Sequence, residues 1–199
     1  VRSAIYDLVV FMLGTGCRIS EALAVRWRDL DLVGVEHEGR HVAVAYLGPV
    51  IVEVKGKGLV RREKGKTGAS VHDRRVVPLP RFVVDMLVLR RPEWARDDDP
   101  VFPAQSRRRG KQPTSGVGYR SANNVDRAWR VIRERHGYPW VTWHIFRKTA
   151  ISEWKAMGLT DLQAADMAGH KQVSMTQNTY YGRNQLHPEA ADRPGYDKA

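Results

Sequence analysis

Apolar residues recur every three or four positions along several stretches of the chain, which is the spacing that gathers them on one face of a helix. A Gly-Thr-Gly sequence at 14–16 predicts the end of a first helix, and a second helix is expected to follow it. The apolar positions that define the two helices are Ile5, Leu8, Val9 and Met12 within residues 3–13, and then Ile19, Leu23 and Trp27.

The second half of the chain shows the same periodicity. It predicts helices at residues 81–90, 121–136, about 143–157 and 174–181. Thr142 is a suitable N-cap for the third of these, whose expected buried face consists of Phe146, Ala150, Trp154 and Met157. Thr160 and Gln163 have the spacing of a capping box, which predicts a further short helix ending at Gly169.

Strand-like patterns are confined to the middle of the chain. Residues 40–55 are rich in Val and contain a Gly-Pro break, so they predict the two strands of a hairpin, and residues 74–80 predict a third strand. The polar, Gly-rich segments at 55–73 and 97–116 are expected to be loops. The fold predicted from these patterns is α+β, mainly helical, with one small antiparallel sheet.

Composition limits the class of protein. With 199 residues, of which 42% are hydrophobic, the chain is long enough for one domain or two small ones. The sequence contains no run of 18 apolar residues, so no membrane span is predicted. The single cysteine, Cys17, suits a reducing compartment, and we expect a cytoplasmic protein. The sequence contains no His-Glu-x-x-His or paired-cysteine pattern, so no metal site is predicted.

Because the chain begins with Val inside a helical pattern, we expect a fragment of a longer protein.

The net charge of +11 predicts a polyanionic partner, most often nucleic acid. Two basic runs, at residues 61–66 and 107–111, are expected to contact phosphates without reading sequence. The alternative is a basic, solvated surface with no such partner. Charge alone therefore favours DNA or RNA binding but does not predict chemistry.

Three short segments carry candidate chemistry. His144 and Arg147 are three residues apart and share a helix face, Arg18 follows the Gly-Thr-Gly sequence, and His170 precedes Tyr180 by ten residues. Each segment also has an ordinary interpretation when taken alone. The first would be a solvated helix surface, the second a residue of a helix's first turn, and the third a capping histidine with a packed tyrosine.

Taken together and in order, these segments resemble the tyrosine recombinases, also called phage integrases. The matching sequences are GCRISEAL, KTGASVHDRRVVPLP, TWHIFRKTA and MAGHKQVSMTQNTYY. The resemblance runs from about residue 3 to 182. It implies a tyrosine recombinase catalytic domain at 1–182, a polar tail at 183–199, and no N-terminal DNA-binding domain of the family in this chain.

The resemblance also implies the site residues, and Glu21 matches the acid that follows the first arginine. Phe146, Lys148 and Ala168 depart from the usual residues of the family without removing a catalytic group. The interval after Lys66 is longer than usual, so Lys57 and Lys64 remain alternatives for the hairpin lysine. The residues that match the catalytic set of the family are Arg18, Lys66, His144, Arg147, His170 and Tyr180.

The chemistry implied is attack of a tyrosine oxygen on a DNA phosphodiester, which forms a 3′-phosphotyrosine and releases a 5′-hydroxyl. Two guanidiniums, of Arg18 and Arg147, suit the non-bridging oxygens. His144 suits proton transfer and Lys66 suits protonation of the departing oxygen. Arginines then do the charge work of Mg²⁺, so no metal or cofactor is expected. The register after His170 favours Tyr180 over the adjacent tyrosine as nucleophile.

The expected partner is double-stranded DNA, and the resemblance implies a homotetramer on two duplexes for the full-length protein, with a possible accessory directionality factor. Two alternatives stay open. A type IB topoisomerase shares the chemistry but relaxes supercoils, and a non-catalytic DNA-binding protein needs the charge but not the six residues. The sequence does not indicate the DNA target.

Overall fold

The structure is a computed structural model that describes residues 4–63, 74–104 and 118–170. The helices are α1 (Ala4–Thr15), α2 (Ile19–Ala22), the 3-10 helix η1 (Trp27–Asp29), α3 (Arg81–Arg90), α4 (Ala122–Arg135), α5 (Trp143–Ala156) and α6 (Asp161–Ala168). The strands are β1 (Leu30–His37), β2 (Arg40–Leu47), β3 (Val50–Val54), β4 (Gly58–Arg62) and β5 (Arg75–Pro78).

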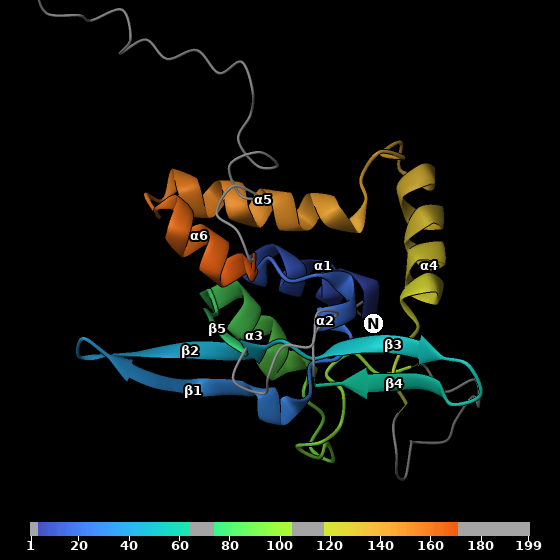
Figure 1. The fold of residues 1–199 in the computed structure, drawn as a ribbon, viewed down its shortest axis with the longest axis horizontal. Coiled ribbons are helices and arrows are strands. Elements are labelled where there is room, and N and C mark those ends of the chain that lie inside the picture. Colours follow the sequence, from blue (N-terminus) through green and yellow to red (C-terminus); the bar gives the residue numbers. More distant parts are fainter. Residues whose placement is uncertain (1–3, 64–73, 105–117, 171–199) are drawn as a thin grey trace, which may run out of the picture.

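Helix α1 lies at the centre of the molecule. Its sequence is apolar on most faces, and Leu8, Phe11 and Met12 are fully buried. A helix of this kind needs partners on several sides. It contacts α5 and α3, and Figure 1 shows α5 and α6 on one side of α1 and α2 with the strands on the other. The core is built around this helix and holds the segments on both sides of it together.

The strands form two antiparallel sheets. In the larger sheet the order is β1-β2-β5, with Leu30 opposite Ala45 and Ala45 opposite Val77. Glu38 and Gly39 join β1 to β2 and both have positive φ, as a two-residue type I′ turn requires. The smaller sheet pairs β3 with β4. The predicted fold class, α+β and mainly helical with antiparallel strands, is confirmed, but the strands form two sheets where one was predicted.

The predicted hairpin at 40–55 is wrong, although both of its strands exist. β2 pairs with β1 and β5, whereas β3 pairs with β4, so the Gly48–Pro49 break carries the chain from one sheet to the other. The loop expected at 55–73 contains β4, in which Leu59 and Val60 lie opposite Glu53 and Val52. Cross-strand partners, rather than local composition, decide these assignments.

The second helix is much shorter than predicted. α2 ends at Ala22, and the chain beyond it becomes extended because it pairs with residues 97–101. The amide of Val101 donates to the Val25 carbonyl at 2.9 Å, and that of Trp27 donates to the Asp99 carbonyl at 3.2 Å. Trp27 is buried as predicted, but in a 3-10 turn.

The helices predicted in the second half agree closely with α3, α4, α5 and α6. The capping box forms, with the Gln163 amide donating to the Thr160 hydroxyl at 3.3 Å. Thr142 occupies the N-cap of α5, but its side chain makes no capping hydrogen bond. Met157 is 73% exposed, because it is the C-cap and lies beyond the last turn of α5. The helix predicted at 174–181 lies outside the described residues.

No helix in the described part of the chain is both long and apolar enough to cross a membrane.

Candidate active site

Arg147 joins three segments that are far apart in the sequence. It lies on α5 and is only 2% exposed. Its Nη1 donates to the Gly16 carbonyl and its Nη2 donates to the Ala168 carbonyl, each at 2.6 Å. These bonds tie the loop after α1 and the end of α6 to α5. The segments that carry Arg18 and His170 are thereby brought to the same guanidinium.

Gly16 makes this arrangement sterically possible. Its φ of +58° lies in the left-handed region, and a Cβ built there would lie 2.6 Å from Cη2 of Trp154. Only a glycine therefore allows the loop to turn tightly against α5 with its carbonyl directed at Arg147. Trp154 itself is buried between α5 and α6.

Arg18 occupies the N-cap of α2, and its side chain is 46% exposed. Its backbone amide donates to Oε2 of Glu21 at 2.7 Å, and its Nη1 lies 3.6 Å from Oε1 of the same carboxylate. The guanidinium of Arg18 thus stays accessible to solvent while its backbone is fixed. In this respect it differs from the buried Arg147, although the sequence predicted equal roles for the two.

Glu21 is buried, and a second arginine accounts for its charge. Arg75, the first residue of β5, donates from Nη1 and Nη2 to the two carboxylate oxygens, each at 2.8 Å. Burial acts to raise the pKa of Glu21, but the hydrogen bonds and charge of Arg75 outweigh it, with help from Arg18, so the pKa falls below its ordinary value of 4.5. The carboxylate is therefore ionised at neutral pH.

Sequence reasoning missed Arg75. The signal available was the alternation of β5 and the residues after it, because Arg75 shares a strand face with the buried Val77 and Leu79. A cation on a buried face requires a carboxylate partner. The adjacent Arg74 points to the other side, where it donates to Asp29.

Two histidines lie in the field of these arginines. Burial, followed by the charges of Arg147 and Arg18, lowers the pKa of His170 to about 4 from its ordinary value of 6.5. Burial and then the charge of Arg147 also lower the pKa of His144. Both imidazoles are therefore neutral at physiological pH. Four of the six predicted residues, Arg18, His144, Arg147 and His170, are thus brought together.

The family model of the phage integrase family matches residues 2–187 of this sequence. The chain belongs to the phage integrase family. A relative from Caldanaerobacter subterraneus subsp. tengcongensis, named tyrosine recombinase XerC-like, is 26% identical over 181 residues, which are 87% of this chain and 44% of that protein.

Solved structures show the same fold. The integrase of transposon Tn1549, in complex with a circular intermediate DNA, matches with a TM-score of 0.68 and 19% identity, covering 94% of this chain and 56% of that one. XerA recombinase matches with a TM-score of 0.57 and 19% identity, covering 94% and 54%. XerH recombinase bound to its difH substrate matches with a TM-score of 0.58 and 15% identity, covering 96% and 47%. The chain spans about half the length of these relatives.

Lys66 and Tyr180, the remaining two predicted residues of this integrase-family chain, lie outside the described residues, as do the alternative Lys64 and the basic run at 107–111. The other alternative, Lys57, lies in the turn between β3 and β4. Within residues 4–63, 74–104 and 118–170, no group of three or more His, Cys, Asp or Glu side chains could hold a metal ion.

Cys17 lies beside the site but is not a nucleophile. It is fully buried, and burial together with the nearby charge of Glu21 raises its thiol pKa to about 12. The Thr15 hydroxyl donates to its sulfur at 3.2 Å. The thiol is therefore protonated at neutral pH and acts as a small core residue of the integrase fold.

The basic run at 61–66 includes a side chain that is buried, that of Arg61. Arg61 is 6% exposed, and it donates from Nη2 to Asp29 at 2.8 Å and from Nε to the Ala24 carbonyl at 2.8 Å. Asp29 also accepts from Arg74 at 3.2 Å. The expectation that this run contacts phosphates along its length is therefore wrong for Arg61, which the fold uses to join β4 to η1.

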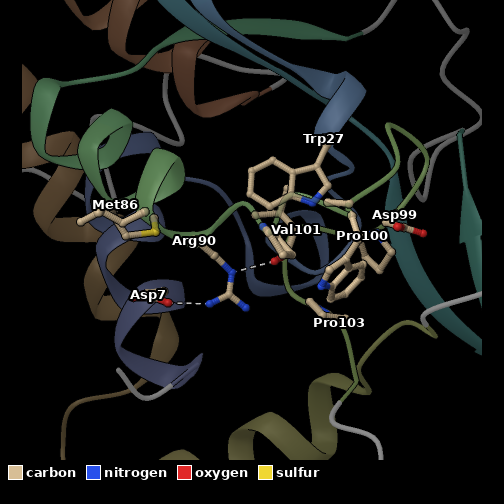
Figure 2. Close-up of a pocket in the computed structure, with 12 residues that line it drawn as sticks. Asp7, Trp27, Met86, Arg90, Asp99, Pro100, Val101 and Pro103 are labelled. Atoms are coloured by element: carbon tan, nitrogen blue, oxygen red, sulfur yellow. Dashed lines mark hydrogen bonds and ion pairs between the residues drawn. The ribbon is translucent and has the colours of Figure 1, made fainter. Parts of the chain in front are cut away.

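A hollow of about 290 Å³ lies in another part of the molecule, between α1, α3 and the loop at 97–103. Figure 2 shows Arg90 at its wall, paired with Asp7 and donating from Nε to the Val101 carbonyl at 2.7 Å. Trp27 and Pro100 line the same hollow. None of the four assembled candidate residues lines it, so it is separate from the site around Arg147.

Proposed function

We propose that this chain is the catalytic domain of a site-specific DNA recombinase, an integrase that cleaves and rejoins DNA through a 3′-phosphotyrosine intermediate. The observation that carries the proposal is the meeting of Arg18, Arg147, His144 and His170 at one site. Two cations and two neutral imidazoles suit a substrate that carries negative charge and exchanges protons.

In this proposal the scissile phosphate binds at Arg18. The exposed guanidinium offers forked donors to the non-bridging oxygens, on which negative charge increases as the phosphorus becomes pentacoordinate. The charge of Arg147 adds to that of Arg18. The guanidinium of Arg147 donates from Nη1 to the Gly16 carbonyl and from Nη2 to the Ala168 carbonyl. Arg147 thus holds the site together and supplies positive potential in the same place.

The reaction consists of one exchange at phosphorus. The hydroxyl oxygen of Tyr180 forms a bond to phosphorus, the bond from phosphorus to the 5′-oxygen breaks, and the leaving oxygen takes a proton from Lys66. The phenol has an ordinary pKa of about 10, so it needs a proton acceptor. His144 takes that proton as a neutral imidazole, and His170 donates a hydrogen bond to the phosphate. Attack by a 5′-hydroxyl from another strand reverses the step.

Double-stranded DNA is the proposed substrate, and the net charge of +11 supports this. The similar Tn1549 integrase is in complex with a circular intermediate DNA, and the similar XerH recombinase is bound to its difH substrate. We further propose that the full-length protein acts as a homotetramer on two duplexes in the cytoplasm, with an accessory factor that sets direction.

Covalent capture on nicked DNA tests the proposal and separates the alternatives. The probe is a pool of duplexes with randomised sequence, each carrying a nick a few nucleotides 3′ of the intended cleavage position. Cleavage then releases a short fragment with the 5′-hydroxyl, which diffuses away, so the strand cannot be rejoined and the adduct is trapped. A recombinase leaves protein–DNA adducts that survive denaturation and are enriched for one sequence. A type IB topoisomerase leaves adducts of diverse sequence and relaxes plasmid DNA. A non-catalytic binder retards the DNA but leaves no adduct, which would overturn the proposal.

A further inference from the structure

Arg75 is not among the six predicted catalytic residues, yet Nε, Nη1 and Nη2 of its guanidinium all donate hydrogen bonds. Its side chain is 10% exposed, and its hydrogen bonds to Glu21 and Met167 are 2.8–2.9 Å long. Nη1 and Nη2 reach the two oxygens of Glu21, each at 2.8 Å, and Nε donates to the Met167 carbonyl at 2.9 Å. One planar guanidinium therefore joins α2 to the end of α6. This is the bidentate geometry that distinguishes arginine from lysine.

The first connection leads to Arg18. Glu21 accepts from the Arg18 amide at 2.7 Å with the same oxygen that accepts from Nη2 of Arg75. The order of contacts is therefore Arg75, then Glu21, then the backbone of Arg18. Because α2 has only four residues, it does not fix its own N-cap strongly. The direction of the Arg18 guanidinium depends on this carboxylate and on what holds it.

The second connection leads to His170. The Met167 carbonyl belongs to the last turn of α6, three residues before the histidine. Gly169 ends that helix with a φ of +67°, and a Cβ on it would lie 2.9 Å from Nη1 of Arg75. The end of α6 is thus shaped around this guanidinium. The charge of Arg75 also contributes to the lowered pKa of His170, after burial and the charges of Arg147 and Arg18.

We propose that Arg75 is a positioning residue of this active site, which sets Arg18 through Glu21 and His170 through the end of α6. Its burial keeps it from the substrate, so it acts on the reaction through these two groups. The inference rests on the proposed function, because it concerns the rate of the same DNA cleavage.

The chain contains a matched control. Arg90 is 15% exposed on its side chain, pairs with the buried Asp7 and donates from Nε to a backbone carbonyl, that of Val101. Like Arg75 it joins a buried carboxylate to a backbone carbonyl, although it reaches only one oxygen of Asp7, and it lines the separate hollow (Figure 2). Loss of either arginine breaks a buried ion pair, so both losses lower stability. Only loss of Arg75 is expected to change the chemistry of the folded protein.

The experiment compares Arg75→Met, Arg75→Lys and Arg90→Met with the wild-type chain, each at a temperature where it is folded. The first readout is the single-turnover rate of adduct formation on the sequences that the randomised pool selects. We expect Arg75→Met to be slower by about 100-fold, since small misplacement of catalytic groups has effects of this size. Arg75→Lys, which keeps the charge but not the fork, also stays slow, and Arg90→Met stays within about twofold per folded molecule.

The second readout needs no DNA and is the NMR titration of the His170 imidazole. Arg75→Met removes a cation and leaves the charge of Glu21 balanced by Arg18 alone, so the pKa of His170 rises, while Arg90→Met leaves that pKa unchanged. Any of three results would overturn the inference. Arg75→Met could form adducts as fast as the wild type, it could lose no more of that rate than Arg90→Met, or it could leave the pKa of His170 unchanged. Absence of adducts with the wild type would instead overturn the proposed function, and the titration would still decide whether Arg75 controls His170.

Discussion

Two buried arginine–carboxylate pairs, each with an Nε bond to a backbone carbonyl, lie in different parts of this molecule. Arg75 pairs with Glu21 and donates from Nε to the Met167 carbonyl, and Arg90 pairs with Asp7 and donates from Nε to the Val101 carbonyl. The difference lies in what each carboxylate touches next. Glu21 accepts from the Arg18 amide. Oδ1 of Asp7 has no hydrogen-bond partner in the described part of the chain.

The comparison separates stability from chemistry. Both pairs join segments that are distant in the sequence, and removal of one partner from either leaves a buried charge without compensation. Only the pair of Arg75 and Glu21 is continuous with exposed cations and imidazoles. A buried ion pair therefore indicates a functional site when its groups also contact side chains that solvent or substrate can reach. When its groups contact only buried carbonyls and carboxylates, as around Arg90, the pair serves stability.

The largest effect is expected for Arg147→Lys. The guanidinium donates hydrogen bonds to two carbonyls, and its charge lowers the pKa of both histidines. The ammonium of lysine cannot reproduce this two-pronged donation. Single-turnover cleavage should fall by about 100-fold to 1,000-fold, the range found when one preorganised donor is lost. DNA binding, measured by fluorescence anisotropy, should persist. Arg90→Lys is the matched control and should cleave like the wild type; equal losses in the two variants would remove the distinction between the regions.

A smaller difference is expected between Glu21→Gln and Asp7→Asn. Each leaves an arginine buried without its anion, so urea denaturation should show both destabilised by about 3 kcal/mol. Glu21→Gln should also slow cleavage by about tenfold, because a neutral amide holds Arg18 less firmly than a carboxylate. Asp7→Asn should cleave normally once folded. Slower cleavage by folded Asp7→Asn would contradict the assignment of that pair to stability alone.

The Glu21 pair also predicts a pH dependence. Because the folded pKa of Glu21 lies below its ordinary value of 4.5, its contribution to stability is complete above pH 4.5 and is lost as the pH falls through the lower folded value. In Glu21→Gln this part of the acid destabilisation should be missing. Denaturant titrations of the variant and the wild type across that window would measure it.

Gly16→Ala is expected to have a moderate effect at the opposite side of the Arg147 guanidinium. A Cβ at this residue would overlap Trp154, and the positive φ adds strain. The free energy of unfolding should fall by about 1–3 kcal/mol. Cleavage should fall as the Gly16 carbonyl moves away from Arg147. Gly158→Ala is the control, because its φ of +92° is also strained but nothing lies within 4 Å. Equal behaviour of the two variants would show that crowding against Trp154 is unimportant.

The smallest effect concerns His170. Its pKa is lowered from 6.5 to about 4, so the unfolded chain binds more protons than the folded chain between these values. The contribution of His170 to stability is therefore complete above pH 6.5 and is lost as the pH falls toward 4. His170→Gln should show a shallower loss of stability across this window. An equal slope in the wild type would mean that His170 titrates normally in the folded chain.

Much of the helical fold was predictable because it depends on local signals. The capping box of Thr160 and Gln163 and the apolar face of α4 are encoded within a few residues. The sheets were not predictable in the same way. β1 and β4 contain charged residues and glycines, and they are strands because distant partners pair with them. The extended chain after α2 likewise depends on residues 97–101.

The candidate site shows the same division. Arg18, His144, Arg147 and His170 were identified through ordered motifs, which preserve residue type and spacing. Their unequal burial was not predictable, because it follows from how the end of α6 and the loop after α1 meet at α5. The part of Arg75 was missed for a related reason. Arg74 and Arg75 look alike in the sequence, and only the strand face separates the residue that reaches Glu21 from the one that reaches Asp29.

The most direct test of the account is to identify the residue that becomes linked to DNA. Adducts formed on the selected nicked duplexes are digested with protease and nuclease, and the modified peptide is mapped by mass spectrometry. We expect a phosphotyrosine link at Tyr180. Tyr180→Phe should bind DNA without forming an adduct, while Tyr181→Phe should still form one. In the helix predicted from the sequence at 174–181, adjacent side chains would point about 100° apart and could not both reach one phosphate. An adduct on Tyr181, or one that persists in Tyr180→Phe, would contradict the account.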